Sequence, residues 1–214
     1  MPTTALSPLL IVIAVIGGYL LGTIPFGVIS MKLAGVGDPR DIGSGSIGAT
    51  NVLRSGRRDL AALTLIGDSG KGALAVLVAW FITKDGPKDI QAVLIALAGG
   101  SAFLGHLFPV WLGFKGGKGV ATFFGTLLAA AWPVCLAAGA TWLAMAFLFR
   151  ISSLAGLTAA VMAPIFALFL FDQPYPITVM ALFMAVLIFV RHQENIGRLL
   201  KGQEPKIGAK KDAA

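Results

Sequence analysis

Residues 120–149 read VATFFGTLLAAAWPVCLAAGATWLAMAFLF, and this apolar run decides how the chain is arranged. A membrane-spanning helix needs about 20 apolar residues, so a run of this length is either one long helix or two short ones. The dipeptide Trp132-Pro133 lies near its middle. Because proline is tolerated inside membrane helices, the break alone does not choose between the two arrangements.

The composition of the whole chain predicts an integral membrane protein. Of its 214 residues, 57% are hydrophobic and 13% are charged, whereas a soluble domain has about 25% charged residues. We therefore expect an all-α transmembrane domain over residues 1–200, in contact with membrane lipid, and a basic, flexible tail over 201–214. The other apolar segments are 8–30, 60–82, 90–112, 154–171 and 177–190.

The distribution of Lys and Arg favours seven transmembrane helices. With two helices in 120–149, fourteen of these residues lie on one side and two on the other, with Lys71 inside the second span; with one helix the counts become seven and nine. Positive residues gather in cytoplasmic loops. We therefore predict an outer N-terminus, a cytoplasmic C-terminus and several short helices, two of which span only about 22 Å. The net charge of +7 then requires no nucleic-acid partner.

This topology brings three unusual motifs to the cytoplasmic side, the first of which is GSGSIGATNVLR over 43–54. It contains the G-x-G-x-x-G spacing of a dinucleotide site, but a loop broken by glycine and proline precedes it where that site needs a strand. Its small residues let N–H groups approach an anion, and its arginine suits phosphate. We therefore predict an anion site formed by Gly43, Ser44, Gly45, Asn51 and Arg54.

The second motif is GHLFPVWLGFKGGKG over 105–119. Glycines and lysines at the start of a helix form an anion cradle, because N–H groups are free there and the helix dipole is positive. The motif is not a P-loop, since Leu112 and Gly119 stand where a glycine and a Ser or Thr are required. We predict that Lys115, Gly116, Gly117 and Lys118 bind phosphate. His106 is either a further ligand or a packed, hydrogen-bonded histidine.

The third motif is RHQENIGR over 191–198, in which Arg191, His192, Asn195 and Arg198 can share one polar helix face. The second span also holds charge, because Asp68 and Lys71 lie at i, i+3. Charges within a membrane are functional by default, although an internal ion pair that stabilises helix packing is an equal alternative.

Metal or other cofactor chemistry is not expected. The chain has two histidines and one cysteine, and no Cys, His and Asp grouping has the spacing of metal ligands.

Taken in order, the three motifs resemble those of the bacterial acyl-phosphate-dependent glycerol-3-phosphate acyltransferases, the PlsY family. The resemblance covers nearly the whole chain. It implies seven helices in the cytoplasmic (inner) membrane and an active site that faces the cytoplasm. The implied reaction transfers a fatty acyl group from acyl phosphate to the 1-hydroxyl of sn-glycerol 3-phosphate. Lysophosphatidic acid and phosphate are the products, in the first acylation step of phospholipid synthesis.

The resemblance also implies roles for single residues. Ser44, Arg54, His192 and Asn195 match residues needed for activity, and Glu194 matches a glutamate with a structural role. Two roles remain open for His192: it is a general base, or it is a donor that orients a phosphate. A substrate phosphate oxygen is the alternative acceptor for the proton. Ser46 replaces the Asn that is usual in the family. The further candidate substrate contacts are Asp68, Lys71, His106, Lys115, Gly116, Gly117, Lys118, Ser152, Ser153 and Arg191.

Two further expectations concern partners and alternatives. Besides the two substrates, the soluble enzyme that produces acyl phosphate is a candidate partner. The rival function is transport of a phosphorylated metabolite. The short outer loops 83–89 and 172–176 argue against it, because a transporter needs polar access from both sides.

Overall fold

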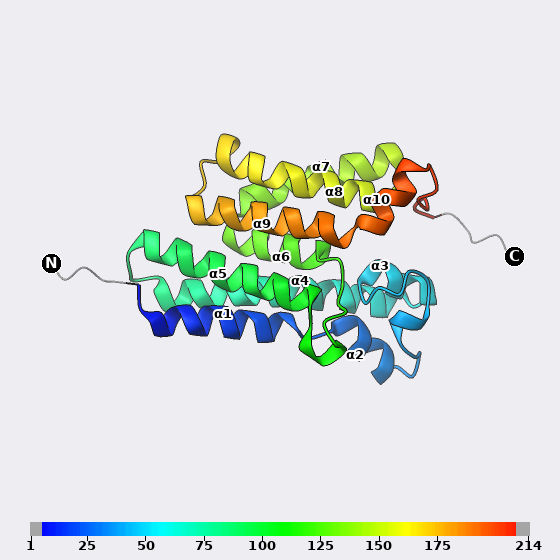
Figure 1. Ribbon diagram of the computed structural model, residues 1–214, viewed down its shortest axis with the longest axis horizontal. Helices are drawn as coiled ribbons and strands as arrows, with labels where there is room; N and C mark the ends of the chain where they lie inside the picture. The colour runs from blue at the N-terminus through cyan, green and yellow to red at the C-terminus, as the bar shows by residue number, and fades with distance from the viewer. Residues whose placement is uncertain (1–5, 209–214) are drawn as a thin grey trace, which may run out of the picture.

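The structure is a computed structural model that describes residues 6–208, over which the chain forms ten α-helices and no strand. The all-α prediction is thus confirmed for these residues. The long helices run side by side, so that α1 begins at one end of the molecule and α10 lies at the other (Figure 1). The helices are α1 (Pro8–Gly22), α2 (Phe26–Leu33), α3 (Ala49–Val52), α4 (Arg58–Thr83), α5 (Lys88–Leu107), α6 (Val120–Ala130), α7 (Trp132–Phe149), α8 (Ser152–Ile165), α9 (Tyr175–Arg191) and α10 (Gln193–Leu200). Short 3₁₀ helices lie at η1 (Pro39–Asp41), η2 (Leu53–Ser55) and η3 (Val110–Leu112), and a π-helical segment, η4 (Phe166–Leu170), follows α8.

The apolar run 120–149 forms two helices, as the charge distribution indicated. Ala131 leaves the helical conformation between α6 and α7, at φ −155° and ψ 69°. Pro133 then falls in the first turn of α7, where its missing N–H leaves no hydrogen bond unmade. The prediction that each of these two helices would span about 22 Å was wrong, because α6 has 11 residues and α7 has 18. Their lengths are about 17 and 27 Å at 1.5 Å per residue.

The first predicted span, 8–30, is interrupted as well. Helix α1 ends at Gly22 and α2 begins at Phe26. Pro25 causes this break, since proline has no N–H to donate and biases the residue before it away from helical angles. At the other end of the chain, α9 and α10 meet at an angle of 64°.

By length and composition, five helical segments can cross a membrane, or six if the bent pair α9 and α10 is one span. This count treats Pro8–Leu33 as a single segment and leaves out α6, which is apolar but short. Seven spans therefore require that α6 also crosses part of the membrane.

Close backbone contacts hold the centre of the bundle together. Helix α5 contacts α1, α4, α6 and α9. A Cβ atom on Gly22 of α1 would lie 2.0 Å from the Ala102 carbonyl oxygen of α5, and one on Gly125 of α6 would lie 1.9 Å from the Ser69 carbonyl oxygen of α4. Only glycine permits such contacts, which are the usual means of packing helices in lipid.

We predict opposite effects of two Gly→Ala substitutions on stability. Gly125→Ala forces α4 and α6 apart, so the thermal unfolding midpoint in detergent should fall by several degrees. Gly139→Ala, in α7, meets no atom within 4 Å, and removing a helical glycine ordinarily stabilises by roughly 0.5–1 kcal/mol. Its midpoint should stay level or rise; equal midpoints for the two variants would contradict the packing described here.

Candidate active site

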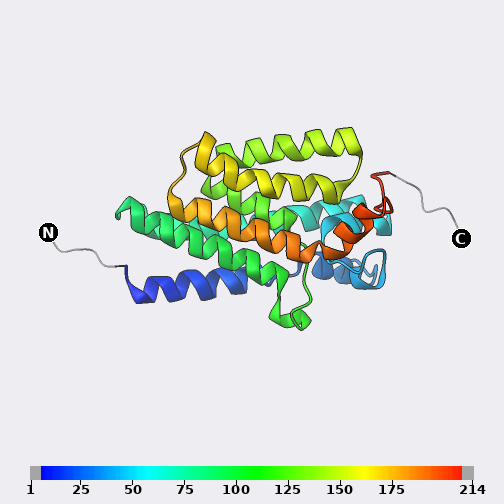
Figure 2. The same ribbon diagram turned by 45° about the horizontal axis from the view of Figure 1, so that its top comes forward.

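Four connecting segments meet at one end of the bundle, on the right in Figure 1. They are the α2–α4 connection, the α5–α6 loop, the start of α8 and the α9–α10 junction. Both ribbon views place the α5–α6 loop beside α2 (Figures 1 and 2), and Trp111 of that loop donates from Nε1 to Thr23 Oγ1 at 2.8 Å. The structure thus brings the three predicted motifs to the same end of the molecule, which we call the loop end.

Asn51 shapes the first motif. Its Nδ2 lies 2.6 Å from the Pro39 carbonyl oxygen and 2.8 Å from that of Ser46, and its Oδ1 accepts from the Ser44 N–H at 2.9 Å. The side chain is 3% exposed. We expected Asn51 to contact a substrate; instead its amide holds the loop's own backbone in place.

Ser44, Thr50 and Arg54 are the exposed polar side chains of this motif. Gly43 has a φ of +56°, and a Cβ atom there would lie 2.8 Å from Arg54 Cδ and 3.0 Å from Nη1. Glycine is therefore needed both for the turn and for the arginine that crosses it. Within residues 6–208, Arg54 makes no hydrogen bond or ion pair with protein, so its guanidinium is available to an anion.

The glycine N–H groups of the second motif are hydrogen-bonded within the protein. The Gly116 N–H donates to the Leu107 carbonyl and the Gly117 N–H to the His106 carbonyl, both at 3.1 Å. Arg191 donates to the Gly116 and Gly117 carbonyls at 3.0 and 3.2 Å, and its guanidinium lies over the Phe108 ring. In this arrangement both glycine N–H groups are already hydrogen-bonded, and Arg191 uses two of its five N–H donors on the glycine carbonyls. The glycines bring the loop close to α5, so that it presents its lysines.

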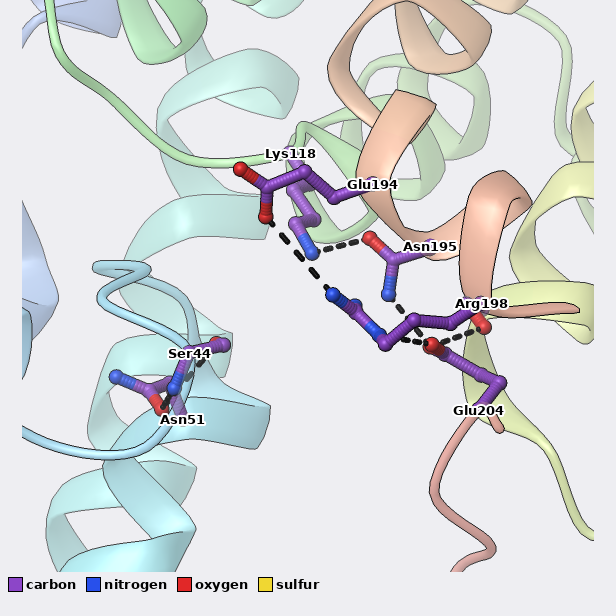
Figure 3. A network of polar contacts seen from close by, with 8 residues as sticks. Ser44, Asn51, Lys118, Glu194, Asn195, Arg198 and Glu204 are labelled. Atoms are coloured by element: carbon purple, nitrogen blue, oxygen red, sulfur yellow. Dashed lines mark hydrogen bonds and ion pairs between the residues drawn. The ribbon is translucent and has the colours of Figure 1, made fainter. Parts of the chain in front are cut away.

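Lys118 and the α9–α10 junction form one polar network, shown in Figure 3. Lys118 Nζ donates to Asn195 Oδ1, and Asn195 Nδ2 donates to Glu204 Oε1 at 2.5 Å. The same carboxylate accepts from Ser153 Oγ and from Arg198 Nε, each at 2.7 Å. The structure therefore brings together Lys118, Ser153 and Asn195, which the sequence assigned to the site separately.

The charges in this network change the acidity of its members. Burial lowers the pKa of Lys118, and the charges of Arg198 and Arg54 lower it further. Burial alone would raise the pKa of Glu204, but hydrogen bonds from Asn195, Ser153 and Arg198 outweigh it and lower that pKa. Figure 3 shows the Ser44 and Asn51 pair and this network in one close view, as two separate groups of polar contacts.

Glu204 was missed in the sequence. Residues 201–214 were expected to be a flexible tail, but residues 201–208 fold back onto the bundle, while 209–214 lie outside the described residues. The Ile207 N–H donates to the Arg150 carbonyl at 2.6 Å, and the Glu204 side chain is 7% exposed. Glu194, to which the structural role was assigned, is 86% exposed and lies 3.9 Å from Arg198. The available signal was an acid, Glu204, between the lysines of a basic tail.

His192 lies buried at the bend between α9 and α10, with 3% of its surface exposed. Its Nδ1 is 2.8 Å from the Ile188 carbonyl oxygen. Since a carbonyl can only accept, Nδ1 carries the proton of the neutral ring and Nε2 is left as an acceptor.

The remaining predicted residues lie in two different environments. Ser152 is half-buried in the first turn of α8, and Lys115 is exposed on the α5–α6 loop. Asp68, Lys71 and His106 instead lie inside the bundle, each at most 3% exposed, in contact with one another. None of the three has an exposed side chain.

The loop end thus offers cations and hydroxyls for anions that carry phosphate. Its exposed or half-buried groups include the Ser44 hydroxyl, the Arg54 guanidinium and the Lys118 ammonium. Among the described residues, no three His, Cys, Asp or Glu side chains are grouped so as to hold a metal ion.

Comparison with known proteins agrees with this chemistry. The family model described as glycerol-3-phosphate acyltransferase matches residues 12–202. The glycerol-3-phosphate acyltransferase of Caulobacter vibrioides is 71% identical over 209 residues, which are 98% of this chain and 93% of the relative. That of Rhodospirillum rubrum is 57% identical over 213 residues, which are 99% of this chain and 98% of the relative.

Solved structures also match the fold. The crystal structure of PlsY (YgiH), an integral membrane glycerol 3-phosphate acyltransferase, in its glycerol 3-phosphate form is 39% identical with a TM-score of 0.84. The match covers 92% of this chain and 96% of that one. The lysophosphatidic acid form of PlsY gives a TM-score of 0.82 at 38% identity, with 92% and 95% covered.

We predict that Glu204→Gln loosens the folded tail. The substitution keeps the size of the side chain but removes the charge that Arg198 and the two other donors hold. Trypsin should then cleave after Lys206 several-fold faster than in the wild type. The lowered pKa means that the carboxylate contributes stability above about pH 4.3 and loses it as pH falls through the lowered value.

The matched control is Glu194→Gln, which changes an exposed glutamate near the same arginine. Its cleavage rate should equal that of the wild type. Equal rates for all three proteins would show that Glu204 does not hold the tail.

Proposed function

Because the chain belongs to the glycerol-3-phosphate acyltransferase family, we propose that it takes its acyl group from acyl phosphate and transfers it to the 1-hydroxyl of sn-glycerol 3-phosphate. The observation that carries this proposal is the pair of cationic sites at the loop end, Arg54 on one motif and Lys118 on another. Both substrates bear phosphate, so two cations near each other suit a site in which the substrates meet.

The reaction needs little chemistry from the protein. The hydroxyl oxygen of glycerol 3-phosphate bonds to the acyl carbon, the bond from that carbon to the phosphate oxygen breaks, and phosphate leaves with the electron pair. Because acyl phosphate is an activated mixed anhydride, positioning and charge stabilisation suffice, and no protein nucleophile is required.

We assign roles on this basis. Arg54 and Lys118 bind the phosphates, with Lys115 and Ser152 at the edge of the site. Ser44 orients the reacting hydroxyl. Asn195 fixes the Lys118 ammonium, to which it is hydrogen-bonded. Two acceptors are available for the hydroxyl proton: His192 Nε2 and an oxygen of a bound phosphate.

We also propose seven spans in the bacterial cytoplasmic membrane, with the N-terminus outside and the loop end facing the cytoplasm. The separate helix α6 and the count of fourteen Lys and Arg against two support this topology. An alkaline phosphatase fusion should be active at the N-terminus and inactive at the C-terminus, and a fluorescent protein should show the reverse. The same outcome at both ends would contradict an odd number of spans.

The donor is tested with purified protein in lipid, given glycerol 3-phosphate and either palmitoyl phosphate or palmitoyl-CoA. We expect lysophosphatidate and phosphate from the first donor only. Product from the thioester alone would refute the donor. No product from either, together with uptake of glycerol 3-phosphate into sealed proteoliposomes, would favour the rival transport function.

The same assay tests the residues. Ser44→Ala and Arg54→Ala should each lower kcat/KM by on the order of a hundredfold or more, which is the usual cost of losing a group that positions or stabilises reacting charge. Ser55→Ala and Arg58→Ala are the matched controls. Ser55 Oγ donates only to the Val52 carbonyl, and Arg58 is an exposed side chain nearby. A wild-type rate in either Ser44→Ala or Arg54→Ala would remove that residue from the site.

A further inference from the structure

A charged cluster lies buried inside the bundle. Lys71 Nζ is 2.9 Å from Asp68 Oδ1, and His106 Nδ1 is 3.5 Å from the same oxygen. The three side chains are 1%, 1% and 3% exposed. Replacing a buried ion pair with apolar residues is often neutral or stabilising, so packing alone does not account for this cluster.

Lys71 connects the cluster to the first motif. Its Nζ donates to the Ile24 carbonyl at 2.9 Å, where the α1–α2 break leaves that carbonyl without its helical partner, since the Val28 N–H donates to Pro25. Helix α2 then supports the loop that carries Ser44. A Cβ atom on Gly27 would lie 2.0 Å from the Ile47 carbonyl oxygen, so the two backbones are in contact.

His106 connects the same cluster to the second motif. A Cβ atom on Gly117 would lie 2.2 Å from His106 Nε2, so the ring is packed against the backbone one residue before Lys118. The Gly117 N–H donates to the His106 carbonyl, and Arg191 holds the Gly117 carbonyl. The ring thus limits how deep the loop can settle toward α5.

We propose that Asp68, Lys71 and His106 are positioning residues that fix the Ser44 loop and the Lys118 loop relative to each other. The proposal rests on the function proposed above, because it makes the spacing of the two loops the quantity that brings the substrates together. Asp68 is the shared member, since it is ion-paired with Lys71 and its Oδ1 lies 3.5 Å from His106 Nδ1. A misplacement of about 1 Å far from the reacting atoms can lower a rate by roughly a hundredfold.

The first test removes both charges at once. A single substitution leaves an unpaired buried charge and destabilises the protein, whereas Asp68→Asn/Lys71→Met leaves none. We expect the double variant to keep a thermal midpoint near that of the wild type and to lose at least about tenfold in kcat, measured per folded molecule after size-exclusion chromatography. A cluster that serves only stability would leave kcat unchanged in this folded variant, and that result would overturn the proposal.

The second test separates the two loops. His106→Leu leaves the Asp68–Lys71 pair in place and disturbs only the loop at Gly117. It should raise KM for one of the two phosphate-bearing substrates by about tenfold and leave the other KM unchanged. His106→Gln, which restores a polar group that can meet Asp68, should recover part of the loss. Unchanged values of both KM in His106→Leu would overturn the role of His106.

The control is Thr178→Val, which removes a buried hydroxyl from α9 at the end opposite the loops and leaves the shape of the side chain. It should have wild-type kcat and KM. A wild type that fails with acyl phosphate would refute the proposed donor, whereas an active wild type with unaltered variants would refute the positioning role alone.

Discussion

Lipid supplies no hydrophobic force between helices, so this bundle depends on direct contact between backbones. Gly22 brings α1 onto Ala102 of α5, and Gly125 brings α6 onto Ser69 of α4. These contacts lie along the helices that lead to the two ligand-facing loops. Helix α1 continues into α2, which supports the Ser44 loop, and α6 begins just after Lys118. Close packing in the bundle therefore fixes where the loops begin, and only short segments remain to be positioned.

The loops use their glycines to approach protein, so the anion binding of the proposed function falls to side chains. Gly43 makes room for Arg54, and Gly116 and Gly117 place the second loop against α5, with their N–H groups already donating to helix carbonyls. Arg54 and Lys118 are then the cations that the proposed function assigns to phosphate. Glu204 balances part of this charge through Arg198 and fixes Asn195, which orients Lys118. The site is thus cationic at its surface and charge-balanced behind it.

The sequence predicted the parts of this arrangement that composition and charge determine. The break at Trp132-Pro133, the all-α class and the gathering of three motifs at one end follow from apolar length and from where Lys and Arg stand. Two features depend on contacts between distant residues and were missed. Asn51 could be recognised as a scaffold only from the carbonyls it meets, and Glu204 only from a tail that folds back on Ser153 and Asn195. A pattern of neighbouring residues in the sequence does not identify such distant partners.

Under the proposed function, the chemistry of an activated donor explains why rigidity matters more than reactive groups. When the leaving phosphate is already good, the barrier that remains is the encounter of two anionic substrates in one orientation, and the protein lowers it by holding cations at a fixed spacing. Exposed ion pairs are weak and screened by salt, so they would not hold the two loops at a fixed distance. A pair such as Asp68 and Lys71, removed from water and in contact with segments that lead to both loops, resists displacement in more than one direction. Placing those charges inside the bundle therefore suits them to positioning, which neither direct phosphate binding nor packing alone would require.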